Sequence, residues 1–448
     1  MADSTAAGRE ALAAGRDWLS GLPRTAVAHA ERGADPLAAV RKLLEALGNP
    51  HRQLRVIHVA GSKGKGSTAL YIEALLQAGG QRTFTFTSPH LERWTERLRI
   101  DGDEAEPALA LRALESVQRA QRETGITPGF FEALTVAGLW LAAETCVDWA
   151  IVEAGVGGRA DATNVVESRL SLITGIELEH TDRLGPTLEA IAREKAGIVK
   201  PGIPLLAPAL PASIDAILAQ ASHDAGSEFV RLRPSPRPPR AIESPLEVRW
   251  HQRSGLLQVA GSGWSVRTPL QASGSAMAGN AALALAATAR LGLFSREALQ
   301  QGARALSGLQ LPGRMETVST LPWVIVDGAH TRASAESLAD AVRELAPTRV
   351  HLLLSISHGK DAGPVLEALL AVADAATFTR ADPAYSADPA QLAELAYRQR
   401  PDLAGRIEPD PEQALGHAAS DAPGSTLVLA TGSVYLAGRI RGLLNSVG

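Results

Sequence analysis

The stretch Leu54–Tyr71, LRVIHVAGSKGKGSTALY, joins a short apolar strand pattern to a glycine-rich loop and the start of a helix pattern. Four apolar residues between Val56 and Ala60 give the strand signal, and three glycines interleaved with two lysines follow. In a strand–loop–helix unit of this kind, backbone N–H groups and the positive end of the helix dipole bind phosphate, and a lysine reaches the outer phosphates. The stretch therefore predicts a phosphate-binding loop at the end of a strand.

The loop departs slightly from the usual P-loop pattern G-x-x-x-x-G-K-[ST], because Gly66 separates Lys65 from Ser67. A glycine loop with a strand on one side and a helix on the other still indicates a nucleotide. The residues that we expect to bind it here are Ser62, Lys63, Gly64, Lys65, Gly66 and Ser67.

Bulk properties narrow the class of protein. The chain has 448 residues, which is too many for one hydrophobic core, and 45% of them are apolar and 21% charged. A net charge of −4 gives no reason to expect nucleic acid or a membrane surface as a partner. Cys146 is the only cysteine, which excludes an internal disulfide. With neither a signal-peptide core nor an apolar run of membrane-spanning length, we expect a cytoplasmic protein.

Strand patterns alternate with helix patterns of roughly 10–15 residues, which is typical of a parallel sheet covered on both faces. Apolar strand signals occur at 83–87, 149–152, 170–174 and 204–207. The alternation restarts after residue 314, with strands at 323–327, 350–355, 375–379 and 426–430 and helices at 333–345, 363–371, 389–397 and 434–445. The pattern predicts an α/β fold in two parts.

The segment between about 227 and 270 has a different character. Arg231 to Arg240 is rich in Pro and Arg and is expected to be a solvated surface loop, with contact to an acidic substrate as the alternative. Leu256 to Thr268 alternates apolar and polar residues around two glycines, which indicates a hairpin and hence a small β insertion. We expect a first domain over 1–307, a linker at 308–314 and a second domain over 315–448.

Polar clusters follow several of the expected strands, at the edge where open parallel sheets bind ligands. Taken singly, each has an ordinary structural explanation, such as a helix cap or a turn. Together with the glycine loop they indicate a catalytic site. The clusters are Thr87–His90, Phe130–Glu132, Glu153–Asn164, Glu177–Thr181, Glu194–Gly197, Asp327–His330 and Thr431–Ser433.

This order of motifs resembles the Mur ligase superfamily, and most closely folylpolyglutamate synthase and dihydrofolate synthase. The resemblance implies a P-loop-containing, mostly parallel sheet domain of the Mur ligase central-domain type, followed by a smaller Rossmann-like α/β domain. The segments that carry it are HVAGSKGKGST (58–68), TSPHLERWTERLRIDG (87–102), FFEALT (130–135), EAGVGGRADATN (153–164), EHTDRLGPTLEAIAREKAGIVKPGIP (179–204), PGR (312–314) and DGAH (327–330).

The resemblance implies an ATP-dependent amide ligase that adds L-glutamate to dihydropteroate, to (tetrahydro)folate or to both, releasing ADP and phosphate. A carboxylate is a poor acyl donor, so the γ-phosphoryl group would first be moved onto it to give an acyl phosphate, which the amine then attacks. Phosphoryl transfer depends on positioning and positive charge more than on covalent help from the protein. The nucleotide is expected between the two halves of the chain, whose closure would exclude water.

The resemblance also implies the role of individual residues. Lys65 would hold phosphates, and two magnesium ions would use Ser88, Glu132 and His180. Lys195 matches a lysine that is carbamylated in the family, and its carbamate would help to hold the second ion. ATP contacts would come from Asn280, Arg314 and Asp327, with His330 beside them as a third catalytic residue after Lys65 and Lys195. Pterin contacts are expected near residues 29–36 and 139–141, and relatives suggest a monomer.

Some positions depart from the family pattern. Ala276 and Met277 stand where many relatives have His-Gln, Glu179 replaces the usual Asp, and Thr331-Arg332 replaces Asn-Pro. None of these changes removes a group that the chemistry requires. Two alternatives remain: a Mur-type ligase that acts on a non-folate acid acceptor, and a nucleotide-binding module without ligase activity. The simultaneous presence of Glu132, His180 and Lys195 argues against the module.

Overall fold

The computed structural model of the chain describes residues 6–23, 35–240, 242–270, 274–420 and 426–445. Its contacts divide the chain into two compact units. Unit 1 consists of Met1–Gln271 and Met277–Leu309, and unit 2 of Ala272–Ala276 and Gln310–Gly448. Among the described residues, no helix combines the length and apolar character needed to cross a bilayer.

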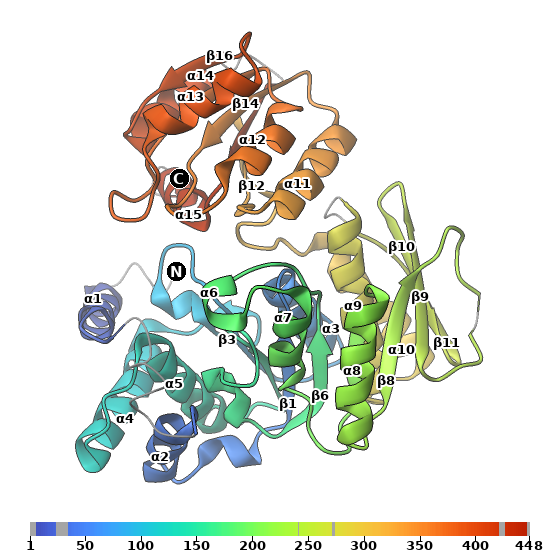
Figure 1. The fold of residues 1–448 in the computed structure, drawn as a ribbon. Helices are drawn as coiled ribbons and strands as arrows, with labels where there is room; N and C mark the ends of the chain where they lie inside the picture. The colour runs from blue at the N-terminus through green and yellow to red at the C-terminus, as the bar shows by residue number, and fades with distance from the viewer. Residues whose placement is uncertain (1–5, 24–34, 241, 271–273, 421–425, 446–448) are drawn as a thin grey trace. The chain divides into compact units, whose positions relative to one another are not determined.

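Unit 1 is built on one 11-stranded sheet, in the order β11-β10-β9-β8-β7-β6-β1-β5-β2-β3-β4 (Figure 1). The strands from β9 to β2 run parallel, and both ends of the sheet continue in antiparallel strands. The strands are β1 Val56–Ala60, β2 Thr83–Phe86, β3 Leu98–Ile100, β4 Asp103–Glu104, β5 Trp149–Glu153, β6 Ser168–Ile173, β7 Leu205–Pro208, β8 Phe229–Pro234, β9 Glu247–Arg253, β10 Leu256–Gly261 and β11 Trp264–Pro269.

Helices cover this sheet and connect its parallel strands. The α-helices are α1 Ala6–Ser20, α2 Ala38–Ala46, α3 Lys65–Ala78, α4 Pro107–Thr124, α5 Phe130–Glu144, α6 Thr181–Leu184, α7 Leu188–Ala196, α8 Ala212–Asp224, α9 Ser275–Arg290 and α10 Arg296–Gly302. Short 3₁₀ helices are η3 Pro50–Gln53, η4 Trp94–Arg97, η5 Ala162–Val165 and η6 Ala303–Gly308. Because β1 and β5 are buried along their whole length, they form the centre of the unit.

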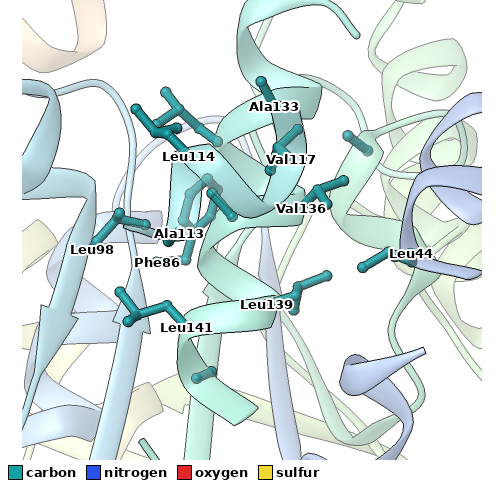
Figure 2. Packing of buried hydrophobic residues seen from close by; sticks show 14 of the residues in the cluster. Leu44, Phe86, Leu98, Ala113, Leu114, Val117, Ala133, Val136, Leu139 and Leu141 are labelled. Carbon is teal, nitrogen blue, oxygen red and sulfur yellow. The ribbon is translucent and has the colours of Figure 1, made fainter. Parts of the chain in front are cut away.

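Helix α5 is the centre of the main hydrophobic core of unit 1 (Figure 2). Leu139 and Leu141 of α5 are almost fully buried in a cluster that also contains Leu44 of α2, Leu114 of α4 and Phe86 of β2. The expected pterin contacts at 139–141 are therefore wrong for these two leucines, whose side chains pack into the protein. The other expected pterin segment, 29–36, lies outside the described residues up to position 34.

Unit 2 contains a six-stranded sheet in the order β12-β13-β17-β14-β15-β16, parallel except for β12. Its strands are β12 Glu316–Thr320, β13 Trp323–Val326, β14 Arg349–Leu354, β15 Ala375–Phe378, β16 Ala404–Ile407 and β17 Thr426–Thr431. Its helices are α11 Arg332–Leu345, α12 Ala362–Leu370, α13 Pro389–Gln399, α14 Pro411–Ser420 and α15 Val434–Asn445. The expectation of two α/β parts, the second one smaller, is confirmed.

Most of the expected elements occur close to their predicted positions, but several were missed. Residues Arg231–Pro234, expected as part of a loop, belong to β8, and β9 follows at Glu247–Arg253. Helices α8 and α14 and the edge strand β16 were not predicted. The expected helix 295–306 is α10 followed by the 3₁₀ turn η6.

Candidate nucleotide and metal site

The glycine loop between β1 and α3 has the backbone shape of a phosphate cradle. Gly61 has φ +145° and Gly64 has φ +82°, in the region that favours glycine. Neighbouring side chains also leave no room for a Cβ atom: one on Gly61 would meet Thr174, and one on Gly64 would lie 2.7 Å from Nδ2 of Asn280. Helix α3 begins at Lys65 with Gly64 as its N-cap, so the helix N-terminus faces the loop.

A second loop, after the neighbouring strand β6, holds the glycine loop in place. The backbone N–H of Ser62 donates to the carbonyl of Gly175 at 2.9 Å, and the Ser62 hydroxyl accepts from the N–H of Glu177 at 2.9 Å. The Thr174 hydroxyl donates to the carbonyl of Lys63. The side chain of Ser62 is thus used to join two loops, while nucleotide binding by Ser62 and Lys63 stays a prediction.

Two lysines converge on one carbonyl of the glycine loop. The Nζ atoms of Lys65 and Lys195 both donate to the carbonyl oxygen of Gly61, at 3.0 and 2.9 Å. Lys195 comes from α7, is 1% exposed and also pairs with Oε1 of Glu179 at 2.8 Å. Burial lowers the pKa of Lys195 and the charge of Lys65 lowers it further, against the opposing effect of Glu179. Lys195 therefore loses its proton to give the neutral amine more readily than an exposed lysine does.

The acidic partner of Lys195 also titrates away from its ordinary value. Burial works to raise the pKa of Glu179, but the nearby charges of Lys195 and Lys65 outweigh it and lower that pKa. Glu177, in the same loop, has its pKa raised by burial. The loop after β6 thus presents the Glu179 carboxylate to Lys195, with Glu177 close by in the sequence.

The carboxylate of Glu153 lies close to the first turn of α3. Glu153 is the last residue of β5, the strand beside β1, and is 2% exposed. Its Oε2 accepts from the backbone N–H of Ser88 at 2.9 Å, and a Cβ atom on Gly66 would lie 3.2 Å from the same oxygen. The structure therefore brings Glu153, Ser88 and the glycine loop together. Glu153 lies in the motif EAGVGGRADATN but was not among the residues predicted to bind metal.

Glu132, which the sequence analysis named as a metal ligand, has another contact in the structure. It lies in the first turn of α5, and its Oε2 accepts from the backbone N–H of Gly129 at 2.7 Å. This hydrogen bond satisfies a donor at the helix start. Metal binding by Glu132 stays a prediction, and Glu153 is the carboxylate with a direct hydrogen bond to Ser88.

His180 lies one residue beyond Glu179, in the loop after β6. It has φ 47°, serves as the N-cap of α6 and is exposed. Since β6 is parallel to β1, this loop lies at the same edge of the sheet as the glycine loop. His180 as a metal ligand also stays a prediction.

The donor set at this edge fits magnesium. Among the described residues, no group of three or more His, Cys, Asp or Glu side chains could by itself hold a metal ion. Mg²⁺ keeps several waters and usually takes one or two carboxylates together with substrate phosphates. A single buried carboxylate, Glu153, beside Ser88 and a phosphate-binding loop matches that requirement.

A buried hydrogen-bonded chain supports the loop that follows β5. Asp161 accepts from Val156 N at 2.8 Å and from the hydroxyl of Thr163 at 2.5 Å. Because that hydroxyl proton goes to Asp161, the hydroxyl oxygen accepts from Nε2 of His58, at 2.9 Å. Burial lowers the pKa of His58 to about 3. These hydrogen bonds join the loop that follows Glu153 to strand β1.

In unit 2, three of the sequence-predicted residues come together. Asp327 is buried, and its carboxylate accepts from Met315 N at 2.9 Å and Ala329 N at 2.8 Å. Burial raises the pKa of Asp327, against the opposing charge of Arg314. A Cβ atom on Gly328 would lie 2.6 Å from Nη1 of Arg314, and Nδ1 of His330 lies 2.8 Å from the Gly328 carbonyl. Their contacts with ATP stay a prediction.

Comparison with known proteins gives matches along the whole chain. The family model described as Mur ligase, glutamate ligase domain, matches residues 313–434. The chain is 32% identical to the folylpolyglutamate synthase of Lacticaseibacillus casei, over 89% of this chain and 92% of that protein. It is 31% identical to the dihydrofolate synthase/folylpolyglutamate synthase of Bacillus subtilis, over 95% of this chain and 97% of that protein.

A longer relative matches over part of its length. The chain is 34% identical to a probable bifunctional folylpolyglutamate synthase/dihydropteroate synthase of Halobacterium salinarum, over 73% of this chain but only 40% of that protein. The rest of that relative lies outside the region that this chain matches.

Solved structures share the fold. The folylpolyglutamate synthase of Mycobacterium tuberculosis, complexed with ADP, superposes with a TM-score of 0.84 at 29% identity, over 98% of this chain and 99% of that chain. A bifunctional folylpolyglutamate synthase/dihydrofolate synthase of Yersinia pestis with Mn, AMPPNP and L-glutamate bound gives a TM-score of 0.80 at 29% identity, over 97% and 98% of the two chains.

Proposed function

The chain belongs to the folylpolyglutamate synthase/dihydrofolate synthase family, and from that premise we propose that it joins L-glutamate to dihydropteroate, to reduced folates or to both. It is an ATP-dependent ligase of the ADP-forming class, like these relatives. The proposal concerns its acceptors, the acyl-phosphate route and the part that each residue takes in the reaction.

The observation that carries the proposal is the group of side chains around the glycine loop. Lys65 and Lys195 lie on one carbonyl of the loop, and Glu153 lies at the start of the following helix. Positive charge, backbone N–H groups and one buried carboxylate are what phosphoryl transfer from a magnesium-bound triphosphate requires. The arrangement supports a site that moves a phosphoryl group and does not merely bind a nucleotide.

We assign the parts as follows. Lys65 and the N–H groups at the start of α3 hold the outer phosphates and stabilise the charge that develops on the transferred group. Glu153 and Ser88 would hold a magnesium ion, which when bound neutralises phosphate charge. The acceptor carboxylate attacks the γ-phosphorus, the bond to ADP breaks, and the acyl phosphate forms. The amine of glutamate then forms the amide, losing a proton as phosphate leaves.

Carbamylation of Lys195 is part of the proposal. A carbamate forms when a neutral amine attacks carbon dioxide and loses a proton, so a lysine with a lowered pKa reacts more readily. Burial and the charge of Lys65 lower the pKa of Lys195 in that direction. The product is an anion, which the Glu179 carboxylate would repel. A cation between the carbamate and Glu179 would offset that repulsion, and a second metal ion near His180 would supply it.

The experiment measures ADP release by the full chain with ATP, magnesium and glutamate. Three reactions are compared: with dihydropteroate, with tetrahydrofolate and without an acceptor. We expect release that depends on glutamate and on at least one of the two acceptors, with a product heavier by one glutamyl residue. ADP release that neither acceptor changes would overturn the folate assignment and favour a ligase for a non-folate acid.

A further inference from the structure

The outer surface of strands β8 to β11 carries a group of arginines that the proposed reaction does not use. Four of them, Arg233 on β8, Arg249 and Arg253 on β9 and Arg267 on β11, are here called the arginine face. All four are exposed, whereas their neighbours in sequence Leu232, Val248 and Val266 are buried. Successive residues of a strand point to opposite faces, so the four arginines share one face of this part of the sheet.

Little negative charge balances this face. Arg249 pairs with Glu247 at 2.8 Å, and Arg231, at the margin of the face, pairs with Asp215 of α8 at 3.0 Å. Within the described part of the chain, no acidic side chain pairs with Arg233, Arg253 or Arg267. The face is therefore cationic although the chain as a whole has a net charge of −4.

The arrangement also has an energetic cost in the absence of a ligand. Arg233 and Arg249 are direct partners in the parallel pairing of β8 with β9. Like charges on directly opposed positions of neighbouring strands destabilise a sheet. The pair of Arg249 with Glu247 offsets part of this repulsion, and an anionic ligand across the two strands would offset the rest.

The arginine face lies at the same edge of the sheet as the glycine loop. The strand pairing aligns Val59 of β1 with Val230 of β8 through β6 and β7. Ser62 and Arg233 each come three residues after these aligned positions, so they lie at the same edge of the sheet. Three strand spacings separate β8 from β1, which is about 14 Å. Arg253 lies further in the same direction, because β9 runs parallel to β8.

Helix α9 packs beside the glycine loop and against the face of β9 that is opposite to the arginine face. Asn280 packs against Gly64 of the glycine loop, and a Cβ atom on the preceding residue, Gly279, would lie 3.6 Å from the ring of Trp250 in β9. Trp250 follows Arg249 in β9, so its side chain points away from the arginine face and toward α9. In Figure 1, β9 to β11 lie beside α9 and α10 as the last strands of this sheet.

We propose that the arginine face binds the γ-glutamyl tail of folate substrates and products, so that tails of several residues are held on unit 1 during extension. The inference rests on the proposed function, because that reaction adds one carboxylate to the tail with each cycle. Arg233 and Arg249 lie on neighbouring strands, about 5 Å apart, and Arg249 and Arg253 are four residues apart on β9, about 13 Å. A row of carboxylates on an extended chain therefore meets several guanidinium groups at once.

The test removes the three arginines that have no acidic partner among the described residues. A variant with Arg233→Gln, Arg253→Gln and Arg267→Gln is compared with a control that carries Arg112→Gln, Arg119→Gln and Arg122→Gln on the exposed side of α4, which loses the same charge. Initial rates are measured with tetrahydrofolate that bears one or four glutamates. We expect the KM for the four-glutamate acceptor to rise on the order of tenfold in the first variant only, with the one-glutamate acceptor unchanged.

A binding measurement completes the test. Tetra-γ-glutamate without a pterin is titrated into the wild-type chain and both variants at low and physiological salt. Weakening confined to the arginine-face variant supports the proposal. Equal binding by all three proteins, or an equal change in KM for both acceptors, overturns it. So does an outcome in which a single-stranded oligonucleotide binds this face and the glutamyl peptide does not. A wild-type chain that extends neither acceptor refutes the proposed function, and the peptide titration still tests the tail site.

Discussion

The side-chain amines of Lys65 and Lys195 donate to the same acceptor, the carbonyl oxygen of Gly61, at 3.0 and 2.9 Å. Two ammonium groups on one oxygen repel each other, and Lys195 lies where water cannot screen that repulsion. The Glu179 carboxylate, 2.8 Å from the Lys195 amine, offsets part of this repulsion. Carbamylation of Lys195 would remove the second positive charge and leave Lys65 as the cation that faces the phosphates.

Replacing Lys65 tests the phosphate role. Lys65→Ala should lower ADP release at least about a hundredfold, because a charged donor to the transferred group is lost. The fold should persist, since the lysine packs on the loop surface. Steady-state rates and circular dichroism provide the measurement, with Lys42→Ala on the exposed side of α2 as the control. An active Lys65→Ala variant would reject the role.

Glu153 and Glu132 can be separated by their magnesium dependence. Glu153→Gln should raise the magnesium concentration needed for half-maximal activity strongly, because its carboxylate lies beside Ser88 and the glycine loop. Glu132→Gln should leave that titration near the wild-type curve and lower the free energy of unfolding by about 1 kcal/mol through the weaker helix cap. A shifted magnesium titration in Glu132→Gln, with none in Glu153→Gln, would assign the ion to Glu132.

Chemical rescue distinguishes a carbamate from an ammonium group at Lys195. Lys195→Ala should lose activity in either case, because the side chain is buried beside Glu179 and the loop. If the native group is a carbamate, added short carboxylates should restore part of the ADP release. If it is an ammonium group, short alkyl amines should do so instead. Rescue by amines alone would remove carbamylation from the mechanism.

His58 predicts a pH dependence of stability. Its pKa is lowered to about 3 in the folded chain by burial, below the ordinary value of 6.5. The unfolded chain therefore binds a proton as the pH falls below 6.5 while the folded chain does not, and stability decreases by up to about 1.4 kcal/mol per pH unit. His58→Gln should flatten the slope of unfolding free energy between pH 6.5 and 5, as measured by urea denaturation. An unchanged slope would exclude this source.

Leu139 tests whether the centre of α5 is core or binding surface. Leu139→Ala should lower the free energy of unfolding by about 2–5 kcal/mol, because the side chain is 2% exposed within the main cluster. The KM for the folate acceptor should stay unchanged in the folded protein. Leu293→Ala, at a position 38% exposed, is the matched control and should change stability far less. A raised KM with intact stability would restore the expected pterin contact.

Sequence patterns were sufficient where a residue's role follows from local chemistry. The glycines of the loop, the apolar runs of β1 and β5 and the first turn of α5 appear at the expected positions because backbone conformation and periodic burial are written in adjacent residues. Strand β8 was missed because Arg231, Arg233 and Pro234 look like a loop, and only pairing with β7 and β9 makes them a strand.

The sequence by itself determined the phosphate-binding loop, the α/β class and the reaction family, since each depends on motifs of neighbouring residues. Tertiary structure alone decided that the backbone N–H of Ser88 donates to the carboxylate of Glu153 and not to that of Glu132, and that Lys195 reaches Gly61. It also gathered the arginine face from three strands. The physical reason is that strand order sets which loops meet at a sheet edge, and strand order is not a local property of the chain.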